Sequence, residues 1–72
     1  MQKAPASYTN YFQVGENQFE FVLEFGTHYP DKLSEAEIHT RLITNPHYAK
    51  RFSELLTVAI RQHEEKNGRI LD

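Results

Sequence analysis

The stretch RLITNPHYAKRF, residues 41–52, begins as an alternating apolar run and then takes on the pattern of a helix start. Asn45 can cap a helix, because its side-chain oxygen can accept a backbone N–H bond from the first turn. Pro46 suits the first helical position, where its missing N–H would be unpaired in any case. The joint Asn45-Pro46-His47 therefore predicts a corner between a strand and a helix.

The residues after this joint have the spacing of one amphipathic helix that ends near Asn67. At about 100° per residue, the apolar side chains share one broad face, called here the apolar arc. The apolar arc consists of Tyr48, Ala49, Phe52, Leu55, Leu56, Ala59 and Ile60. Gly68 is expected to end the helix in the left-handed conformation.

Three runs before the joint alternate with the period of two that is typical of half-buried strands. The strongest is FEFVLEFG, residues 19–26, and the others are residues 8–14 and 36–43. Residues 15–18 and 27–35 contain turn-forming residues that separate the runs. The side chains expected on the inner face are Phe12, Val14, Phe19, Phe21, Leu23, Phe25, Ala36, Ile38, Thr40 and Leu42.

These patterns predict an α+β fold, a three-stranded antiparallel β-meander packed against one long C-terminal α-helix (βββα). Residues 8–72 should form a single domain, and residues 1–7 a flexible lead-in. The inner sheet face and the apolar arc should form the core. On the outer face, antiparallel pairing should set His39 and Arg41 near Glu20 and Glu24.

The length and net charge of the chain restrict the class of protein to which it can belong. A chain of 72 residues buries little surface, and without cysteine it has no disulfide to reinforce its core, so association with a second copy is expected. A net charge of −2 makes nucleic acid an unlikely partner. No apolar run is long enough to span a membrane and no leader is apparent, so the expected location is cytoplasmic.

No catalytic, metal or cofactor site is expected. The four histidines lack the spacing of metal ligands. Glu20 and Glu24 would lie about 13 Å apart along a strand, which is too far to share one reacting centre. Three glycines cannot supply a phosphate-cradling loop. The sequence therefore favours a non-enzymatic protein without a cofactor.

Two surfaces remain as candidates. The first is an anion site in which helix N–H groups and basic side chains hold a phosphate or carboxylate. Its residues would be Arg41, Asn45, His47, Lys50 and Arg51. The simpler interpretation is that Asn45 and Pro46 only start the helix.

The second candidate is a dimer interface on the polar side of the helix, where the charges are inverted in sign about Thr57 and Val58. Two antiparallel copies would pair them, as a twofold interface requires. Its residues would be Lys50, Arg51, Glu54, Val58, Arg61, Glu64 and Glu65. The same charges could instead form ordinary pairs within one helix. A dimer through the outer sheet residues Tyr11, Val22 and Ile43 is a further alternative.

The blocks FEFVLEFG, IHTRLITNPHYAKRF and NGRI resemble a family of small bacterial and phage proteins, the domain of unknown function 3467 family. The resemblance extends from about Tyr8 to Ile70. It implies the fold and a bacterial or phage origin, but no activity. We therefore expect a homodimeric protein–protein interaction module that acts as an accessory or regulator of a partner of unknown identity. The alternative is a binder of anions or nucleic acid at the helix start.

Overall fold

The computed structural model describes residues 3–30 and 36–72, and it confirms the predicted order of three strands and one helix. Strand β1 spans Tyr11–Glu16, β2 spans Phe21–Thr27, and β3 spans Glu37–Thr44. Helix α1 spans Pro46–Asn67 and is 22 residues long. The predicted turn residues Pro30-Asp31 and Ser34 fall at or beyond the edge of the described residues, so the second turn is not characterised.

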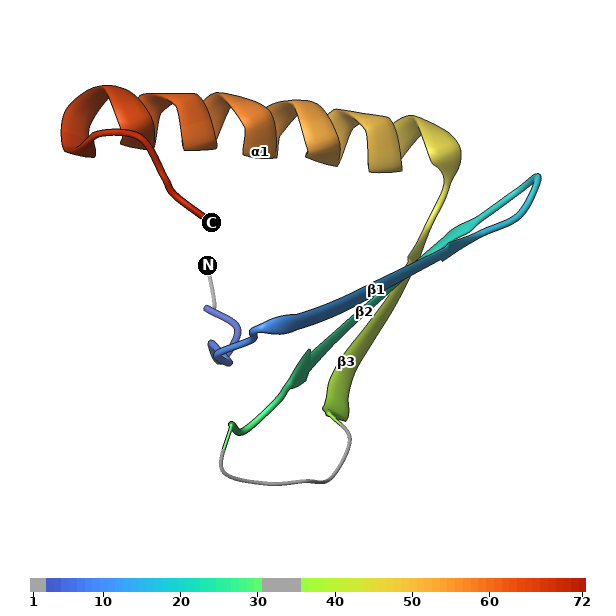
Figure 1. The fold of residues 1–72 in the computed structure, drawn as a ribbon. Helices are drawn as coiled ribbons and strands as arrows, with labels where there is room; N and C mark the ends of the chain where they lie inside the picture. The colour runs from blue at the N-terminus through green and yellow to red at the C-terminus, as the bar shows by residue number, and fades with distance from the viewer. Residues whose placement is uncertain (1–2, 31–35) are drawn as a thin grey trace.

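The strands form one antiparallel sheet in the order β1-β2-β3, with β2 in the centre (Figure 1). Phe12 lies opposite Phe25, and Val14 lies opposite Leu23. Residues directly opposite each other project to the same face, so these four side chains share the inner face, as predicted. The rings of Phe12 and Phe25 meet edge to face, with centroids 5.9 Å apart.

A β-bulge changes the predicted pattern of β3. Thr40 lies opposite Phe25, but Ile38 lies opposite Gly26, so His39 is an extra residue between the two pairs. Gly26 faces outward, because it alternates with Phe25. The expectation that Ile38 lies on the inner face is therefore wrong, since the extra residue turns its side chain to the outer face.

Strand β1 starts three residues later than predicted, although residues 8–10 stay bonded to the end of β2 through side chains and one backbone bond, from the Asn10 N–H to the Gly26 carbonyl at 3.2 Å. The Thr9 hydroxyl donates to the Gly26 carbonyl at 2.6 Å. The Asn10 side chain exchanges two hydrogen bonds with the backbone of His28, at 3.0 and 2.8 Å. The His39 ring lies 3.2 Å from the Tyr8 carbonyl. This segment is thus tied to the end of β2 without being a strand.

Both ends of α1 are capped. The Asn45 side chain accepts a hydrogen bond from the Tyr48 N–H at 2.8 Å, and Pro46 occupies the first helical position, as predicted. Gly68 ends the helix with φ 90 and ψ 168. This positive φ favours glycine, as expected, but the ψ value lies outside the left-handed helical region. The Ile70 N–H donates to a Glu64 carboxylate oxygen at 3.0 Å and turns the chain end back under the helix (Figure 1).

Helix α1 faces the inner side of the sheet but does not close on it. Helix and sheet diverge from the joint at Asn45 (Figure 1). The contacts between elements lie mainly between β1 and β2 and between β2 and β3. Among residues 3–30 and 36–72, no apolar side chain is fully buried. The expected core is therefore not completed within one chain among these residues, because the helix leaves the sheet at an open angle.

We predict that Gly26→Ala lowers the free energy of unfolding by about 1 to 3 kcal/mol, because the added methyl group forces a backbone to move. A Cβ on Gly26 would collide with the Glu37 carbonyl and lie 3.2 Å from the Ile38 Cα. Urea denaturation at fixed protein concentration measures the change. Gly15→Ala is the matched control, because a Cβ there meets nothing within 4 Å. Equal stability of the two variants would contradict the close approach of β2 and β3.

Candidate interaction surface

One residue connects the sheet to the helix. Strand β3 ends at Thr44 and α1 begins at Pro46, so Asn45 alone forms the connection. A residue before proline is restricted to extended conformations, and Asn45 has φ −92 and ψ 167. Connections between strands and helices usually take about two to six residues. This short and stiff connection fixes the angle at which α1 leaves the sheet.

The angle leaves an open apolar space between helix and sheet, which we call the wedge. Its sheet wall includes Val14, Phe21 and Leu23, and its helix wall includes Phe52 and Leu56. The space between these walls is a cavity of about 390 Å³. A second hollow, which reaches Phe12 and Phe25, also touches Phe52 and Leu56. These two helix residues therefore lie at the centre of the wedge.

Val14 and the helix side chains that line the wedge are exposed to an extent that a folded core does not show, whereas Phe21 and Leu23 are half-buried. Val14 on the sheet is 62% exposed, and Phe52 and Leu56 on the helix are each 48% exposed. Leu55, on the same apolar arc, is 53% exposed. Contiguous apolar surface of this kind is a candidate interaction surface.

The whole chain is correspondingly open. Its accessible surface is 6968 Å², against about 4,700 Å² expected for a compact monomer of 8.5 kDa. Its radius of gyration is 14.9 Å, against about 11 Å expected for a compact chain of 72 residues. The exposed lead-in residues and the open wedge both contribute to this excess.

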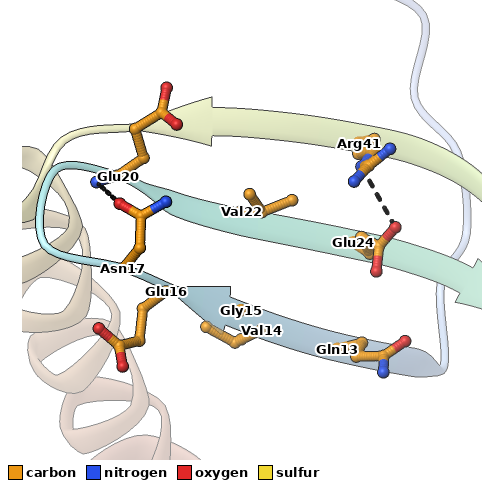
Figure 2. Close-up of a pocket in the computed structure, with 9 residues that line it drawn as sticks. All are labelled: Gln13, Val14, Gly15, Glu16, Asn17, Glu20, Val22, Glu24 and Arg41. Atoms are coloured by element: carbon orange, nitrogen blue, oxygen red, sulfur yellow. Dashed lines mark hydrogen bonds and ion pairs between the residues drawn. The ribbon is translucent and has the colours of Figure 1, made fainter.

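The outer sheet face is polar at its centre. Gln13, Glu24 and Arg41 form a row across the three strands (Figure 2). The Arg41 Nε lies 3.3 Å from a Glu24 carboxylate oxygen, which confirms the predicted cross-strand pair. The Arg41 side chain is 69% exposed, so the pair adds no more than about 1 kcal/mol. His39 instead contacts Thr40 and the Tyr8 carbonyl.

This row borders a shallow hollow of about 260 Å³ that also includes Asn17, Glu20 and Val22 (Figure 2). The Asn17 side chain accepts hydrogen bonds from the N–H groups of Phe19 and Glu20 and closes the turn between β1 and β2 (Figure 2). Val22 and Ile43 are cross-strand neighbours, and Tyr11 and Ile38 lie on either side of Gly26. Within the described part of the chain, no group of three or more potential ligands is placed to hold a metal ion.

The residues of the predicted anion site do not converge. Arg41 lies on the outer face with Glu24, whereas the helix start lies over the inner face, where Lys50 lines the wedge. The Asn45 side-chain oxygen already accepts the Tyr48 N–H, and the His47 ring stacks edge to face on Tyr48 at 5.2 Å. Arg51 is exposed on the helix. Arg41 therefore cannot join the basic residues of the helix start without leaving its pair.

The predicted dimer residues on the polar side of α1 are nearly all exposed. Among the residues that the structure describes, neither Lys50 with Glu54 nor Arg61 with Glu65 forms an ion pair. Glu64 is half-buried, because its backbone and side chain hold the residues after the helix. These placements do not test a dimer, which stays a prediction.

The sequence did not indicate that the wedge stays open. Its lining residues were expected as core, and periodicity identified them correctly by face. Lys50 and Ser53 also line the wedge, although both lie off the apolar arc. The signal that could have predicted the open angle is the short segment, Thr44 and Asn45, between the alternating run and Pro46.

The fold and this surface define a small α+β protein with a three-stranded antiparallel sheet, a C-terminal helix and an unfilled apolar face. The chain belongs to the family described as "Protein of unknown function (DUF3467)", which matches residues 1–72. This confirms the resemblance seen in the sequence. No curated protein and no solved structure matches the chain. Over residues 3–30 and 36–72, no helix is long and apolar enough to cross a membrane.

We predict that Asn45→Ala lowers the free energy of unfolding by about 1 kcal/mol, because the Tyr48 N–H loses its acceptor. Chemical denaturation at fixed protein concentration measures this change. Asn45→Asp is the matched control, since a carboxylate also caps the helix, and it should keep most of the stability. Loss of phosphate binding at unchanged stability, seen by calorimetric titration, would instead support the anion site.

Proposed function

We propose that this protein is a non-enzymatic protein–protein interaction module that works as a homodimer, acting as an accessory or regulator of a larger partner. The observation that carries the proposal is the exposed wedge in a chain with no buried apolar side chain among its described residues. Folded chains are only marginally stable even with a closed core. A chain that leaves this much apolar surface uncovered gains its stability by association.

The size of the uncovered surface supports a permanent interface over a transient one. The excess over a compact monomer is about 2,300 Å² per chain, or about 4,600 Å² for two copies. Stable assemblies of the obligate type bury about 2,000 to 5,000 Å² in total. Even if the lead-in accounts for a third of the excess, the remainder lies within that range.

The alternative function, binding of anions or nucleic acid at the helix start, has less support. Arg41 is paired with Glu24 on the opposite face of the sheet from Lys50. The net charge of −2 provides no positive field to attract phosphate. Titration with salt separates the two functions, because phosphate-driven binding falls steeply with salt and apolar association does not.

We predict that the unfolding of the chain depends on its concentration. For a folded dimer that unfolds to two chains, each tenfold dilution lowers the apparent stability by about 1.4 kcal/mol. Thermal denaturation followed by circular dichroism over a hundredfold concentration range, together with sedimentation equilibrium, measures this. A folded monomer with one melting temperature at all concentrations would contradict the proposed homodimer.

A further inference from the structure

We propose that the free edge of strand β1 is the dimer interface, and that it pairs antiparallel with β1 of a second copy of this chain. The two three-stranded sheets then join into one continuous sheet. The twofold axis passes through the middle of the strand pair, at Gln13, and stands perpendicular to the sheet. The inference rests on the proposed function and adds the surface, the occupant and the register.

The free edge of β1 presents backbone groups that point away from the sheet. Among the described strands, β1 pairs with β2 alone. At the turn between them, the Asn17 N–H donates to the Glu20 carbonyl at 3.0 Å. Hydrogen-bonded and non-hydrogen-bonded pairs alternate along an antiparallel ladder. The N–H and C=O groups of Gln13 therefore point to β2, and those of Phe12 and Val14 point to the free edge.

The segment before β1 leaves this edge uncovered. The Tyr8 carbonyl accepts a hydrogen bond from the Thr27 hydroxyl at 3.2 Å and lies 3.2 Å from the His39 ring. Thr27 ends β2, and His39 belongs to β3. The segment therefore crosses the end of the sheet toward β3, away from the free edge of β1.

The other edge of the sheet carries features that discourage pairing. Strand β3 has a bulge at His39 and a charged residue on each side of it, Glu37 and Arg41. Bulges and charged side chains protect edge strands from pairing with other chains. Strand β1 keeps one register over its whole length, and its single charged residue is Glu16 at its end. The unprotected edge is thus that of β1, and we assign the pairing to it.

One twofold register suits the side chains of β1. When Gln13 lies opposite itself, Phe12 of each copy lies opposite Val14 of the other, so apolar side chains meet on the inner face. These are also the residues whose backbone groups face the edge. On the outer face Tyr11 lies opposite Gly15, where a Cβ would meet nothing within 4 Å, so the ring has room. An aromatic ring opposite a strand glycine shields its backbone.

The neighbouring twofold registers fit less well. With the axis at Val14, Phe12 lies opposite Glu16 of the other copy, and a ring meets a carboxylate on the inner face. With the axis at Phe12, Val14 lies opposite Asn10, whose side chain is bonded to the His28 backbone. A twofold interface requires a surface that matches itself, and the register at Gln13 has this property.

The exposure of the inner side chains agrees with a missing strand beside β1. On the central strand, Phe21, Leu23 and Phe25 are half-buried, because a strand lies on either side. Phe12 and Val14 on β1 are 60% and 62% exposed. A strand on the free side covers them as β1 and β3 cover the central strand. It also continues the sheet wall of the wedge across the axis.

The first test places charges on the axis. Gln13→Lys sets two lysines opposite each other in the dimer and should raise the dissociation constant about fivefold. Within one chain the lysine lies opposite Glu24, so the sheet is not weakened. Sedimentation equilibrium measures the constant, and circular dichroism verifies the fold. Gln18→Lys, in the exposed turn, is the matched control with the same change of charge and should dimerise like the wild type.

A mixture of variants separates the axis from a general effect of charge. Gln13→Glu also sets like charges opposite each other, whereas a Gln13→Lys chain and a Gln13→Glu chain pair opposite charges. With one variant isotope-labelled, native mass spectrometry should record more heterodimer than random exchange gives. Random proportions of the three dimers would overturn the register.

Amide hydrogen exchange tests the unmodified chain. In one chain alone, β2 protects the N–H of Gln13, and the N–H groups of Phe12 and Val14 exchange with solvent. In the dimer all three should be protected, and dilution below the dissociation constant should release Phe12 and Val14. Protection at Arg41 and Ile43 in place of these two residues would assign the pairing to β3 and overturn the proposal.

The outcomes for the homodimer and for the edge pairing are distinguishable. A wild-type chain that is monomeric overturns the proposed homodimer and the edge pairing together. A wild-type dimer in which Phe12 and Val14 exchange freely, and which Gln13→Lys does not weaken, overturns the edge pairing alone and leaves the homodimer intact.

Discussion

The single-residue connection at Asn45 is the constraint on which the rest of this structure depends. Its extended backbone, the proline after it and the hydrogen bond from Tyr48 all act on the same joint. Each has a local cause: proline restricts the residue before it, and the asparagine side chain satisfies a helix N–H that would lack a partner. Together they fix the direction of a long helix, and a small change of angle at the joint moves its far end by many ångströms.

The sheet, in contrast, is held by contacts that a single chain completes. The backbone ladder joins all three strands, and side chains of Thr9 and Asn10 extend the pairing beyond the start of β1. Gly26 is the point where these contacts meet, because its carbonyl accepts from Thr9 and its missing side chain lets β3 approach. Polar and backbone contacts thus organise the sheet, together with apolar contacts between strands such as that of Phe12 with Phe25.

The charges of α1 have an unusual order for an isolated helix. Basic residues at its start and acidic residues near its end oppose the helix dipole, and the first turn contains no acidic residue. An arrangement that costs stability within one helix requires a compensating contact elsewhere. In the proposed homodimer, antiparallel packing of the two helices would supply such a contact, because each basic start would lie beside an acidic end.

The sequence by itself determined the elements and their faces. Alternation identified Phe21, Leu23 and Phe25 as one face of the central strand, and the asparagine and proline at residues 45 and 46 placed the helix start. These features are local, because side-chain period and capping depend on residues a few positions apart. The pairing of Glu24 with Arg41 also followed, since strands joined in a meander are neighbours and their register is set by the same alternation.

Only the tertiary structure decided how these elements meet. The bulge at His39, which turns Ile38 outward, arises from pairing with a strand ten or more residues away and leaves no mark in the alternation. The open wedge depends on the angle between β3 and α1 at Asn45, and the periodicity of the sequence does not specify that angle. Residues predicted to be core, such as Val14 and Leu56, are apolar, and their pattern in the sequence shows only that they favour burial. The hydrophobic effect is non-directional, so the pattern does not specify which surface covers them. The geometry of the joint therefore decides that these residues stay partly exposed in one chain.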